Sequence, residues 1–94
     1  MMFSWDTEKA ILNFEKHGVP FEEAATVFAD LDGLDWQDAA HSQNESRQKR
    51  LGKSSVGRVL LIVYTVRRFP HEKEIIRIIS ARQASRKERK AYAR

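Results

Sequence analysis

The most constraining feature of this 94-residue sequence is a run of branched apolar residues from Val59 to Val66. Apolar residues at successive positions, rather than at alternate ones, indicate a strand that is covered on both faces. A chain of this length forms one small domain around a single core, so we expect this strand at its centre. The run is far too short to cross a bilayer. The sequence therefore predicts one domain over residues 1–94.

Two further segments are predicted to pair with this central strand. Glu45–Leu51 alternates weakly, Gly52–Gly57 has the composition of a turn, and Ile75–Ala81 is again rich in branched apolar residues. The simplest arrangement is an antiparallel meander of three strands. A short edge strand at Leu34–Trp36, inside the acidic loop of residues 29–44, would bring this small sheet to four strands.

Helices are predicted on either side of this sheet in the sequence, which makes the fold class α+β. Asp6 is placed to cap the first helix and Gly18 to end it. Pro20 opens a second helix, and Ser85 caps a short basic helix that runs to Arg94. The second helix is expected to bury one stripe of side chains, Phe21, Ala24, Ala25 and Phe28.

Charge is divided very unevenly between the two halves of the chain. Residues 1–46 hold ten of the 13 acidic and two of the 17 basic residues, and residues 47–94 hold the rest. The halves therefore carry formal charges of −8 and +12, which the total of +4 conceals. A polyanion would approach the basic half, so we expect function there. The absence of cysteine excludes a thiolate nucleophile and suits a cytoplasmic location, and Asp6 and Glu8 interrupt any signal peptide.

Several apparent motifs do not predict chemistry. Gly52-Lys53-Ser54 resembles the end of a phosphate-binding P-loop, but Arg47 stands where the motif requires its first glycine. The acidic loop lacks the spacing of a calcium loop, so neither a metal nor a cofactor is predicted. His41 is the one histidine beside a plausible site, with Glu45 close to it in the sequence. Loop stabilisation and proton transfer both fit His41.

Arginines at the ends of apolar segments give the strongest sign of an anion site. Arg67, Arg77 and Arg82 interrupt or end such segments, where a sheet would hold each guanidinium in a position to bind phosphate. Arg77 and Arg82 are an odd number of positions apart. They share a face only if Arg82 lies beyond the strand or a bulge intervenes; Arg77 could instead pair with an acidic residue of the N-terminal helices. Glu88 and Tyr92 share one helical face near Arg82, as a functional pair or an ordinary packing pair.

Short motifs along nearly the whole chain carry one further signal. They are Phe3-Ser4-Trp5-Asp6, Lys9-Ala10, Asn13, Lys16-His17-Gly18-Val19, Phe21-Glu22-Glu23-Ala24, Val27-Phe28, Asp38, His41-Ser42, Glu45-Ser46-Arg47, Gly52, Gly57-Arg58, Tyr64-Thr65, Ile78-Ile79-Ser80-Ala81-Arg82, Glu88-Arg89 and Tyr92. In this order they closely resemble the BrnT family of toxins. The resemblance implies a ribonuclease with a RelE-like fold that belongs to a type II toxin–antitoxin system. The sequence departs from the family at Pro20 and in a longer hairpin over residues 67–74.

The resemblance also implies a partner and a mechanism. The partner would be a small BrnA antitoxin, whose ribbon-helix-helix part binds operator DNA and whose dimer would join two toxins into a heterotetramer. The mechanism would be endoribonuclease cleavage without a metal, in which a ribose 2′-hydroxyl attacks the adjacent phosphate. On this hypothesis the catalytic residues are Arg67, Arg77 and Arg82 as a phosphate clamp, His41 or Glu45 as the proton acceptor, and Tyr92 to stack a base or donate a proton. The residues expected to hold RNA are Arg47, Lys53, Arg58 and Arg89.

Two other functions fit the same charge pattern. A basic surface alone gives salt-dependent binding to nucleic acid, so the chain could be a binding module without chemistry. The basic face could instead serve mainly as a dock for an acidic antitoxin. A binding module would shift RNA without cutting it, whereas a dock would bind the antitoxin and ignore RNA.

Overall fold

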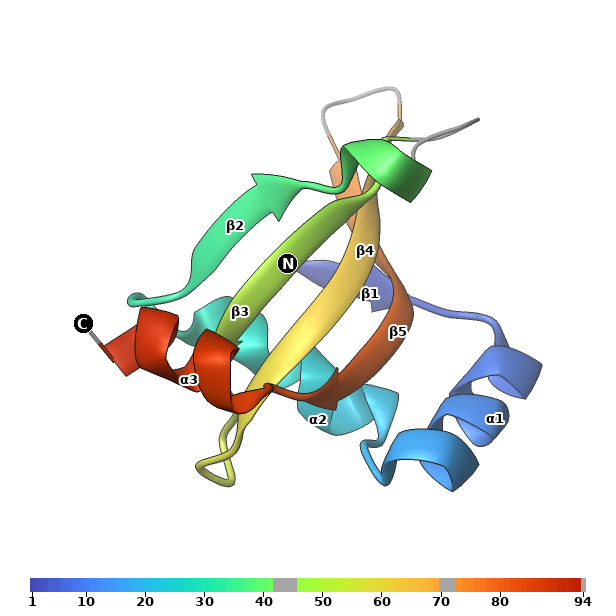
Figure 1. The fold of residues 1–94 in the computed structure, drawn as a ribbon. Coiled ribbons are helices and arrows are strands. Elements are labelled where there is room, and N and C mark those ends of the chain that lie inside the picture. The colour runs from blue at the N-terminus through green and yellow to red at the C-terminus, as the bar shows by residue number, and fades with distance from the viewer. Residues whose placement is uncertain (42–45, 70–72, 94) are drawn as a thin grey trace.

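The computed structural model describes residues 1–41, 46–69 and 73–93, without the side chain of His41. The described strands form one five-stranded sheet in the order β1-β5-β4-β3-β2, with β4 at its centre as predicted. Figure 1 shows α1 and α2 behind this sheet and α3 in front of one end of it. The elements in chain order are β1 (Met2–Ser4), α1 (Thr7–His17), α2 (Phe21–Thr26), the 3₁₀ turn η1 (Val27–Ala29), β2 (Leu34–Gln37), the 3₁₀ turn η2 (Ala39–His41), β3 (Gln48–Lys53), β4 (Val59–Phe69), β5 (Lys73–Gln83) and α3 (Arg86–Ala93).

The sheet differs from the prediction at one edge. β1 pairs in parallel with β5, with Phe3 opposite Ile76, so the sheet is mixed and has five strands rather than three or four antiparallel ones. Three residues are too few to show a strand periodicity, which is why the sequence did not reveal β1. The antiparallel meander of β3, β4 and β5 and the short edge strand β2 are confirmed. The predicted turn at Gly52–Gly57 is shorter than expected, because Gly52 and Lys53 still pair with β4. None of the described helices is long and apolar enough to span a membrane.

The predicted caps of the first and last helices are confirmed. The second helix is shorter than predicted, because Pro20 precedes it and Phe28 lies in η1. Arg94, the predicted end of the last helix, is outside the described residues. Asp6 Oδ1 accepts a hydrogen bond from the Lys9 amide at 3.0 Å, and Gly18 ends α1 in the left-handed conformation at φ 69°. Before α3, Ser85 Oγ accepts from the Glu88 amide at 3.1 Å while Glu88 Oε1 accepts from the Ser85 amide at 2.8 Å. This reciprocal pair is a capping box, which fixes where α3 leaves β5.

The main core lies between the sheet and the layer formed by α1, α2 and η1. Phe21 and Ala24 of the predicted stripe are buried, and Ala25 and Phe28 pack against them in part, as expected. A second, smaller cluster lies on the other side of the sheet, where Tyr92 of α3 packs against Leu51 and Leu61. The main cluster consists of Val19, Phe21, Ala24, Val27, Leu60, Ile62, Tyr64, Ile76, Ile78 and Ala81.

The two clusters define two faces of the sheet. Leu60, Ile62 and Tyr64 of β4 point to the main core, so the alternate positions of β4 point away from α1 and α2. We call this second side the open face, because α3 covers only the part of it near Leu61. Direct partners on neighbouring strands share a face, so the pairing register assigns every strand position to one side or the other.

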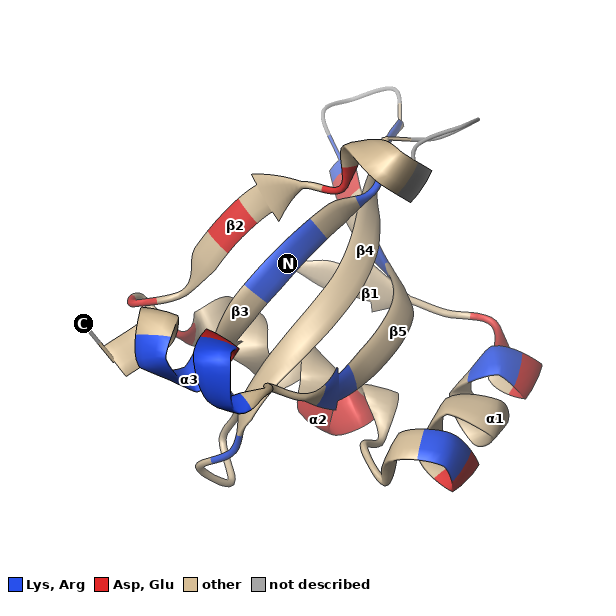
Figure 2. Ribbon diagram, viewed as in Figure 1, with Lys and Arg blue, Asp and Glu red and all other residues tan. Residues whose placement is uncertain are grey.

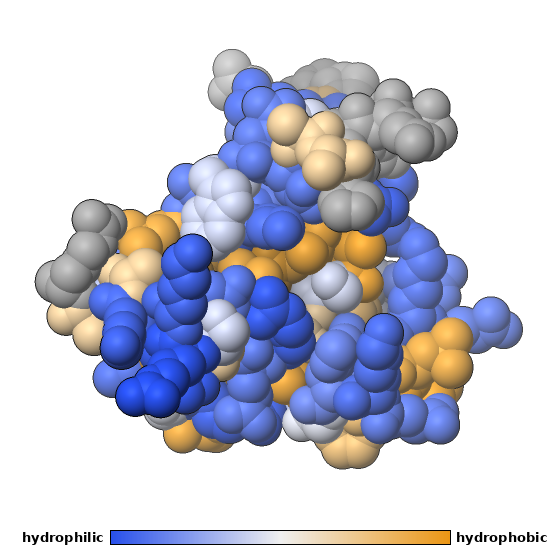
Figure 3. Space-filling view, viewed as in Figure 1, coloured by the Kyte–Doolittle hydropathy of each residue, from blue (hydrophilic) through white to orange (hydrophobic). Residues whose placement is uncertain are grey.

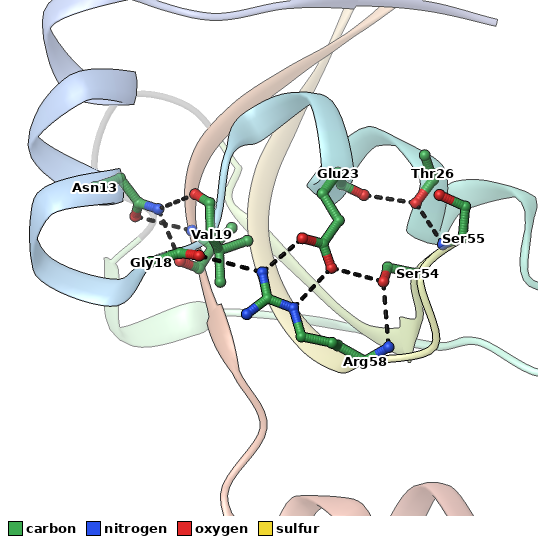
Figure 4. Close-up of polar contacts among 9 residues, drawn as sticks. Asn13, Gly18, Val19, Glu23, Thr26, Ser54, Ser55 and Arg58 are labelled. Carbon is green, nitrogen blue, oxygen red and sulfur yellow. Dashed lines mark hydrogen bonds and ion pairs between the residues drawn. The ribbon is translucent and has the colours of Figure 1, made fainter.

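A side chain from α1 extends the hydrogen bonding of β5 beyond β1. The buried amide of Asn13 donates to Ala81 O at 2.8 Å and to Val19 O at 3.1 Å, and its oxygen accepts from the Ala81 amide at 3.1 Å. Pairing with β1 ends at Arg77, so the Asn13 amide acts as the next strand partner of β5. Figure 4 shows the bond from Asn13 to Val19 beside the residues that connect α2 to the turn between β3 and β4.

Candidate nucleic-acid interface

Three cationic residues and one threonine lie together on the open face. Thr65 of β4 is directly opposite Arg77 of β5, and Arg67 is two positions further along β4 on the same face. Lys49 of β3 is opposite Val63, which places it on the open face diagonally from Thr65. We call these four residues the open-face site.

The register brings these side chains within reach of one ligand. Directly opposed residues such as Thr65 and Arg77 have Cβ atoms about 5 Å apart, and diagonal neighbours such as Lys49 and Thr65 are about 7 to 8 Å apart. Positions two apart on one strand, as for Arg67, are separated by about 7 Å. Long basic side chains extend well beyond their Cβ atoms. A single phosphate group above Thr65 could therefore contact all three cations.

No acidic group among the described residues pairs with Lys49 or Arg77. Both side chains are half-buried, and within residues 1–41, 46–69 and 73–93 neither makes a hydrogen bond or an ion pair. Arg77 points away from α1 and α2, so the predicted alternative of an ion pair with their acidic residues does not occur in the structure. Arg67 is exposed and makes an interaction of its own. A half-buried cation without a partner attracts an anion strongly, because little solvent screens it.

An exposed tryptophan borders the open-face site. Trp36 of β2 is opposite Lys49, and 41% of its surface is exposed. Figure 3 shows a band of hydrophobic surface crossing this face of the molecule between hydrophilic side chains, and Figure 2 shows basic residues on β3, α3 and the end of β5. Aromatic side chains beside cations are the usual platform for stacking the bases of single-stranded nucleic acid.

Thr65 itself lacks a hydrogen-bond partner. Only 2% of the surface of Thr65 is exposed to solvent. Among the described residues, its hydroxyl oxygen is the one buried side-chain polar atom that has no hydrogen-bond partner. The same residue lines a hollow at the end of β4 together with Ser46 and Arg67. Ser46 Oγ accepts hydrogen bonds from the side-chain amides of Gln37 at 3.1 Å and Gln48 at 3.3 Å.

Arg82 lies on the open face, where an acidic residue from α3 matches its charge. Its two terminal nitrogens donate to the two oxygens of Glu88 at 2.8 and 3.0 Å. Hydrogen bonds from Arg82 lower the pKa of Glu88 to about 2. Because Glu88 also closes the capping box with Ser85, this ion pair attaches the start of α3 to β5. Of the two residues predicted to share a helical face near Arg82, only Glu88 contacts Arg82.

Arg58 is held in a second ion pair on the other side of the sheet. Its guanidinium donates to the two oxygens of Glu23 at 2.9 and 2.5 Å and to Gly18 O at 3.2 Å, as Figure 4 shows. Ser54 donates to the same carboxylate at 2.7 Å. These bonds lower the pKa of Glu23, with the hydrogen bond from Arg58 as the largest cause. The network joins α1, α2 and the turn between β3 and β4.

Tyr92 and Lys53 meet at the far end of β3, beside Asp30. The Tyr92 hydroxyl donates to Asp30 Oδ2 at 2.5 Å, and the Lys53 amide donates to the same oxygen at 2.7 Å. The hydrogen bond to Asp30 raises the pKa of Tyr92 to about 12. Burial raises the pKa of Asp30, but the hydrogen bonds that it accepts outweigh burial and lower it overall. The side chain of Lys53 is exposed and borders a hollow next to Tyr92.

The remaining predicted site residues lie around the loop between β2 and β3 or on α3. Arg47 is half-buried, and its carbonyl accepts from the Asp38 amide at 2.8 Å, which joins the two ends of the loop. The backbone of His41 lies in η2, but its side chain and all of Glu45 are outside the described residues. Arg89 is exposed and donates to Ala84 O at 2.8 Å.

Sequence reasoning did not select three of the residues that border this site. Lys49 and Trp36 lie in weakly alternating segments, so only the pairing register shows that they share the open face with Val63 rather than facing the core. Thr65 was noticed as part of a motif, but no role was predicted for it. The signal that could have identified Thr65 is its place two positions before Arg67, on a strand predicted to pair with the strand that carries Arg77.

Comparison with known proteins identifies the class of the chain. Residues 5–88 match a family of ribonuclease toxins from type II toxin–antitoxin systems. The family is described as "Ribonuclease toxin, BrnT, of type II toxin-antitoxin system", and the match covers most of the sequence. The chain therefore belongs to the BrnT family, which confirms the resemblance noted in the sequence. Membership of a type II system implies an antitoxin partner.

A solved structure supports the same conclusion at the level of the fold. The fold is similar to that in the 1.1 Å crystal structure of the Brucella abortus ribonuclease toxin BrnT, with a TM-score of 0.63. The two chains are 21% identical, and the similarity covers 92% of this chain and 100% of that one. A search of curated proteins found no match.

Proposed function

We propose that this chain is the toxin of a type II toxin–antitoxin pair that inhibits translation by cutting RNA in the cytoplasm, without a metal ion. The observation that carries the proposal is the pair of half-buried cations Lys49 and Arg77 on the open face, neither of which has an acidic partner in the described part of the chain. The open face also offers Trp36 as a platform for a base. Family membership supplies the reaction class, and the open face supplies the most suitable surface for it.

The proposed reaction uses the nucleophile that RNA itself contains. The ribose 2′-oxygen attacks the adjacent phosphorus while a base takes its proton, and the bond from phosphorus to the 5′-oxygen breaks. The 5′-oxygen leaves with a proton, so the products are a 2′,3′-cyclic phosphate and a 5′-hydroxyl. Charge grows on the non-bridging oxygens in the transition state, where fixed cations stabilise it most effectively.

The residues take roles that follow from their surroundings. Lys49, Arg67 and Arg77 hold the scissile phosphate, since all three lie on one face around Thr65. His41 or Glu45 takes the proton from the 2′-hydroxyl. Support for this step is their sequence proximity to Ser46, which lines the same hollow as Thr65 and Arg67.

Other predicted residues act in positioning or in holding flanking RNA. Arg82 fixes α3 through Glu88, Tyr92 anchors the other end of α3 on Asp30, and Arg58 braces the helical layer through Glu23. The RNA strand on either side of the scissile phosphate contacts the basic side chains that border the open face or α3, Arg47, Lys53 and Arg89.

The partner is proposed to be a BrnA-like antitoxin with a ribbon-helix-helix part. Operator DNA would be contacted only through that antitoxin, and an antitoxin dimer would join two toxin chains in a heterotetramer. An antitoxin that covered the open face would block the same cations that RNA needs. Acidic groups on the antitoxin would meet the unmatched charges of Lys49 and Arg77 there.

The test is cleavage of a defined RNA by the purified, antitoxin-free chain in EDTA, with analysis of the fragment ends. We expect fragments that carry 2′,3′-cyclic phosphate. Arg77→Ala should lower the single-turnover rate about a hundredfold, because it removes one contact to the transition state. Lys9→Ala is the matched control, since it removes one positive charge from the exposed surface of α1, on the other side of the sheet.

Two outcomes would contradict this function. RNA that shifts on a gel but stays intact would favour a binding module without chemistry, because a basic surface alone gives such binding. Equal rates for Arg77→Ala and Lys9→Ala would show that cleavage takes place somewhere other than the open face.

A further inference from the structure

The hydroxyl of Thr65 is a polar group that the described protein does not satisfy. Its residue is 2% exposed, yet Thr65 Oγ1 has no hydrogen-bond partner among the described residues. A buried hydroxyl without a partner costs free energy in the free protein, and a valine of nearly the same shape would avoid that cost. The position therefore keeps a hydroxyl that does not help the fold.

The surroundings of this hydroxyl are those of an anion site. Thr65 lies directly opposite Arg77, two positions from Arg67 and diagonally from Lys49, all on the open face. It also lines the hollow at the end of β4 with Ser46 and Arg67. A hydroxyl donor among cations matches a phosphate oxygen, which accepts hydrogen bonds and carries negative charge.

We propose that Thr65 Oγ1 donates a hydrogen bond to a non-bridging oxygen of the RNA phosphate held by Lys49, Arg67 and Arg77. This inference rests on the proposed function, because it names the phosphodiester as the ligand of the same site. The cations supply attraction at long range, and the hydroxyl fixes one oxygen in a single direction. Bound RNA satisfies a hydroxyl that has no partner among the described residues of the free protein.

The test combines stability and affinity in one pair of variants. Thr65→Val removes the hydroxyl at nearly constant shape, and Thr65→Ser keeps the hydroxyl while removing the methyl group. Affinity is measured at fixed salt with a fluorescent 2′-fluoro RNA, which lacks the nucleophile and cannot be cut by the proposed reaction. Thermal unfolding of each full-length variant is followed without RNA.

The two readouts of Thr65→Val are expected to move in opposite directions. Its unfolding temperature should rise by a few degrees, because an unsatisfied buried hydroxyl is lost. Its affinity for the 2′-fluoro RNA should fall about tenfold, which is typical of a lost hydrogen bond to a charged group. Thr65→Ser should bind within about threefold of the parent chain, since the hydroxyl remains.

Either of two results would overturn the inference. Unchanged affinity in Thr65→Val would show that the hydroxyl does not contact the phosphate. A lower unfolding temperature for Thr65→Val would show that the hydroxyl is already bonded within the free protein. Binding that depends on Thr65 in a chain that cuts no RNA would support the inference while contradicting the proposed ribonuclease function.

Discussion

Arg77 and Arg82 lie on the same face of β5, although five positions separate them in the sequence. Ile79 between them has no partner on β4, because pairing passes from Val63 opposite Ser80 to Tyr64 opposite Ile78. This β-bulge changes the alternation by one residue, so both arginines point to the open face. The sequence left a bulge open as one way for them to share a face, and the structure confirms it.

Although they share a face, the two arginines differ in their surroundings. Arg77 has no acidic partner among the described residues, whereas Arg82 makes two hydrogen bonds to Glu88. A phosphate could bind Arg77 without displacing any described group, but it would have to compete with Glu88 for Arg82. Arg77 is therefore the better candidate for contact with RNA, and Arg82 for holding α3.

The ion pair between Arg82 and Glu88 should appear as a coupling energy. Each single change, Arg82→Ala or Glu88→Ala, removes the same contact, so the double variant should be more stable than the sum of the two effects implies. We expect a coupling of about 1 kcal/mol, because the pair is two-pronged but partly exposed. Urea unfolding of the four proteins measures it. Strict additivity would show that the pair does not hold α3.

Acid should weaken the attachment of α3 through Glu88. Hydrogen bonds from Arg82 lower its pKa from 4.5 to about 2, so its contribution to the free energy of unfolding is present above pH 4.5 and is lost as the pH falls toward 2. After allowance for solvent screening this contribution is about 1 to 2 kcal/mol. Glu88→Gln should therefore show a flatter dependence of stability on pH in that range. The same slope in both proteins would contradict the assignment.

Asn13 should be essential for stability despite being polar. Asn13→Ala leaves the Ala81 amide and two carbonyl groups without partners at a buried site, so the free energy of unfolding should fall by about 2 to 4 kcal/mol. Asn13→Asp keeps the acceptor for the Ala81 amide but sets a carboxylate against the two carbonyls, and should cost at least as much. Denaturant unfolding measures both. A loss below about 0.5 kcal/mol, the usual size for a surface change, would contradict this role.

Trp36 should contribute to RNA binding and little to stability. Its side chain is 41% exposed and lies opposite Lys49, so Trp36→Ala should weaken binding of 2′-fluoro RNA about tenfold, the typical value of one stacked base. Trp36→Phe should retain most of the affinity, because an aromatic ring remains. Fluorescence anisotropy measures each affinity. Equal losses in both variants would indicate a contact through the indole nitrogen instead of stacking.

Much of the fold could be predicted because its signals are local. Asp6, Gly18 and Ser85 mark helix ends through their own backbone contacts, and the run from Val59 identifies the central strand. The parallel strand β1 could not be predicted, since its partner is more than seventy residues away and it spans only three positions. Edge strands of this length are recognised by pairing, and pairing is not visible in one sequence.

The site was harder to predict than the fold, because it depends on long-range pairing. Arg77 is among the residues predicted for the site, but Lys49 reaches the same surface only through the register of β3 with β4. Arg58 looked like a free basic residue in the sequence, and its partner Glu23 comes from the acidic half of the chain. The charge asymmetry of the sequence thus becomes, in part, a set of ion pairs across the fold.

RNA is proposed to bind the open face around Arg77. The most direct test is an amide and indole NMR titration of the chain with 2′-fluoro RNA. We expect the largest shifts at Lys49, Thr65 and Arg77 and at the indole of Trp36, with small changes along α1. Shifts concentrated on α1 and α2, with the open face unchanged, would contradict this proposal.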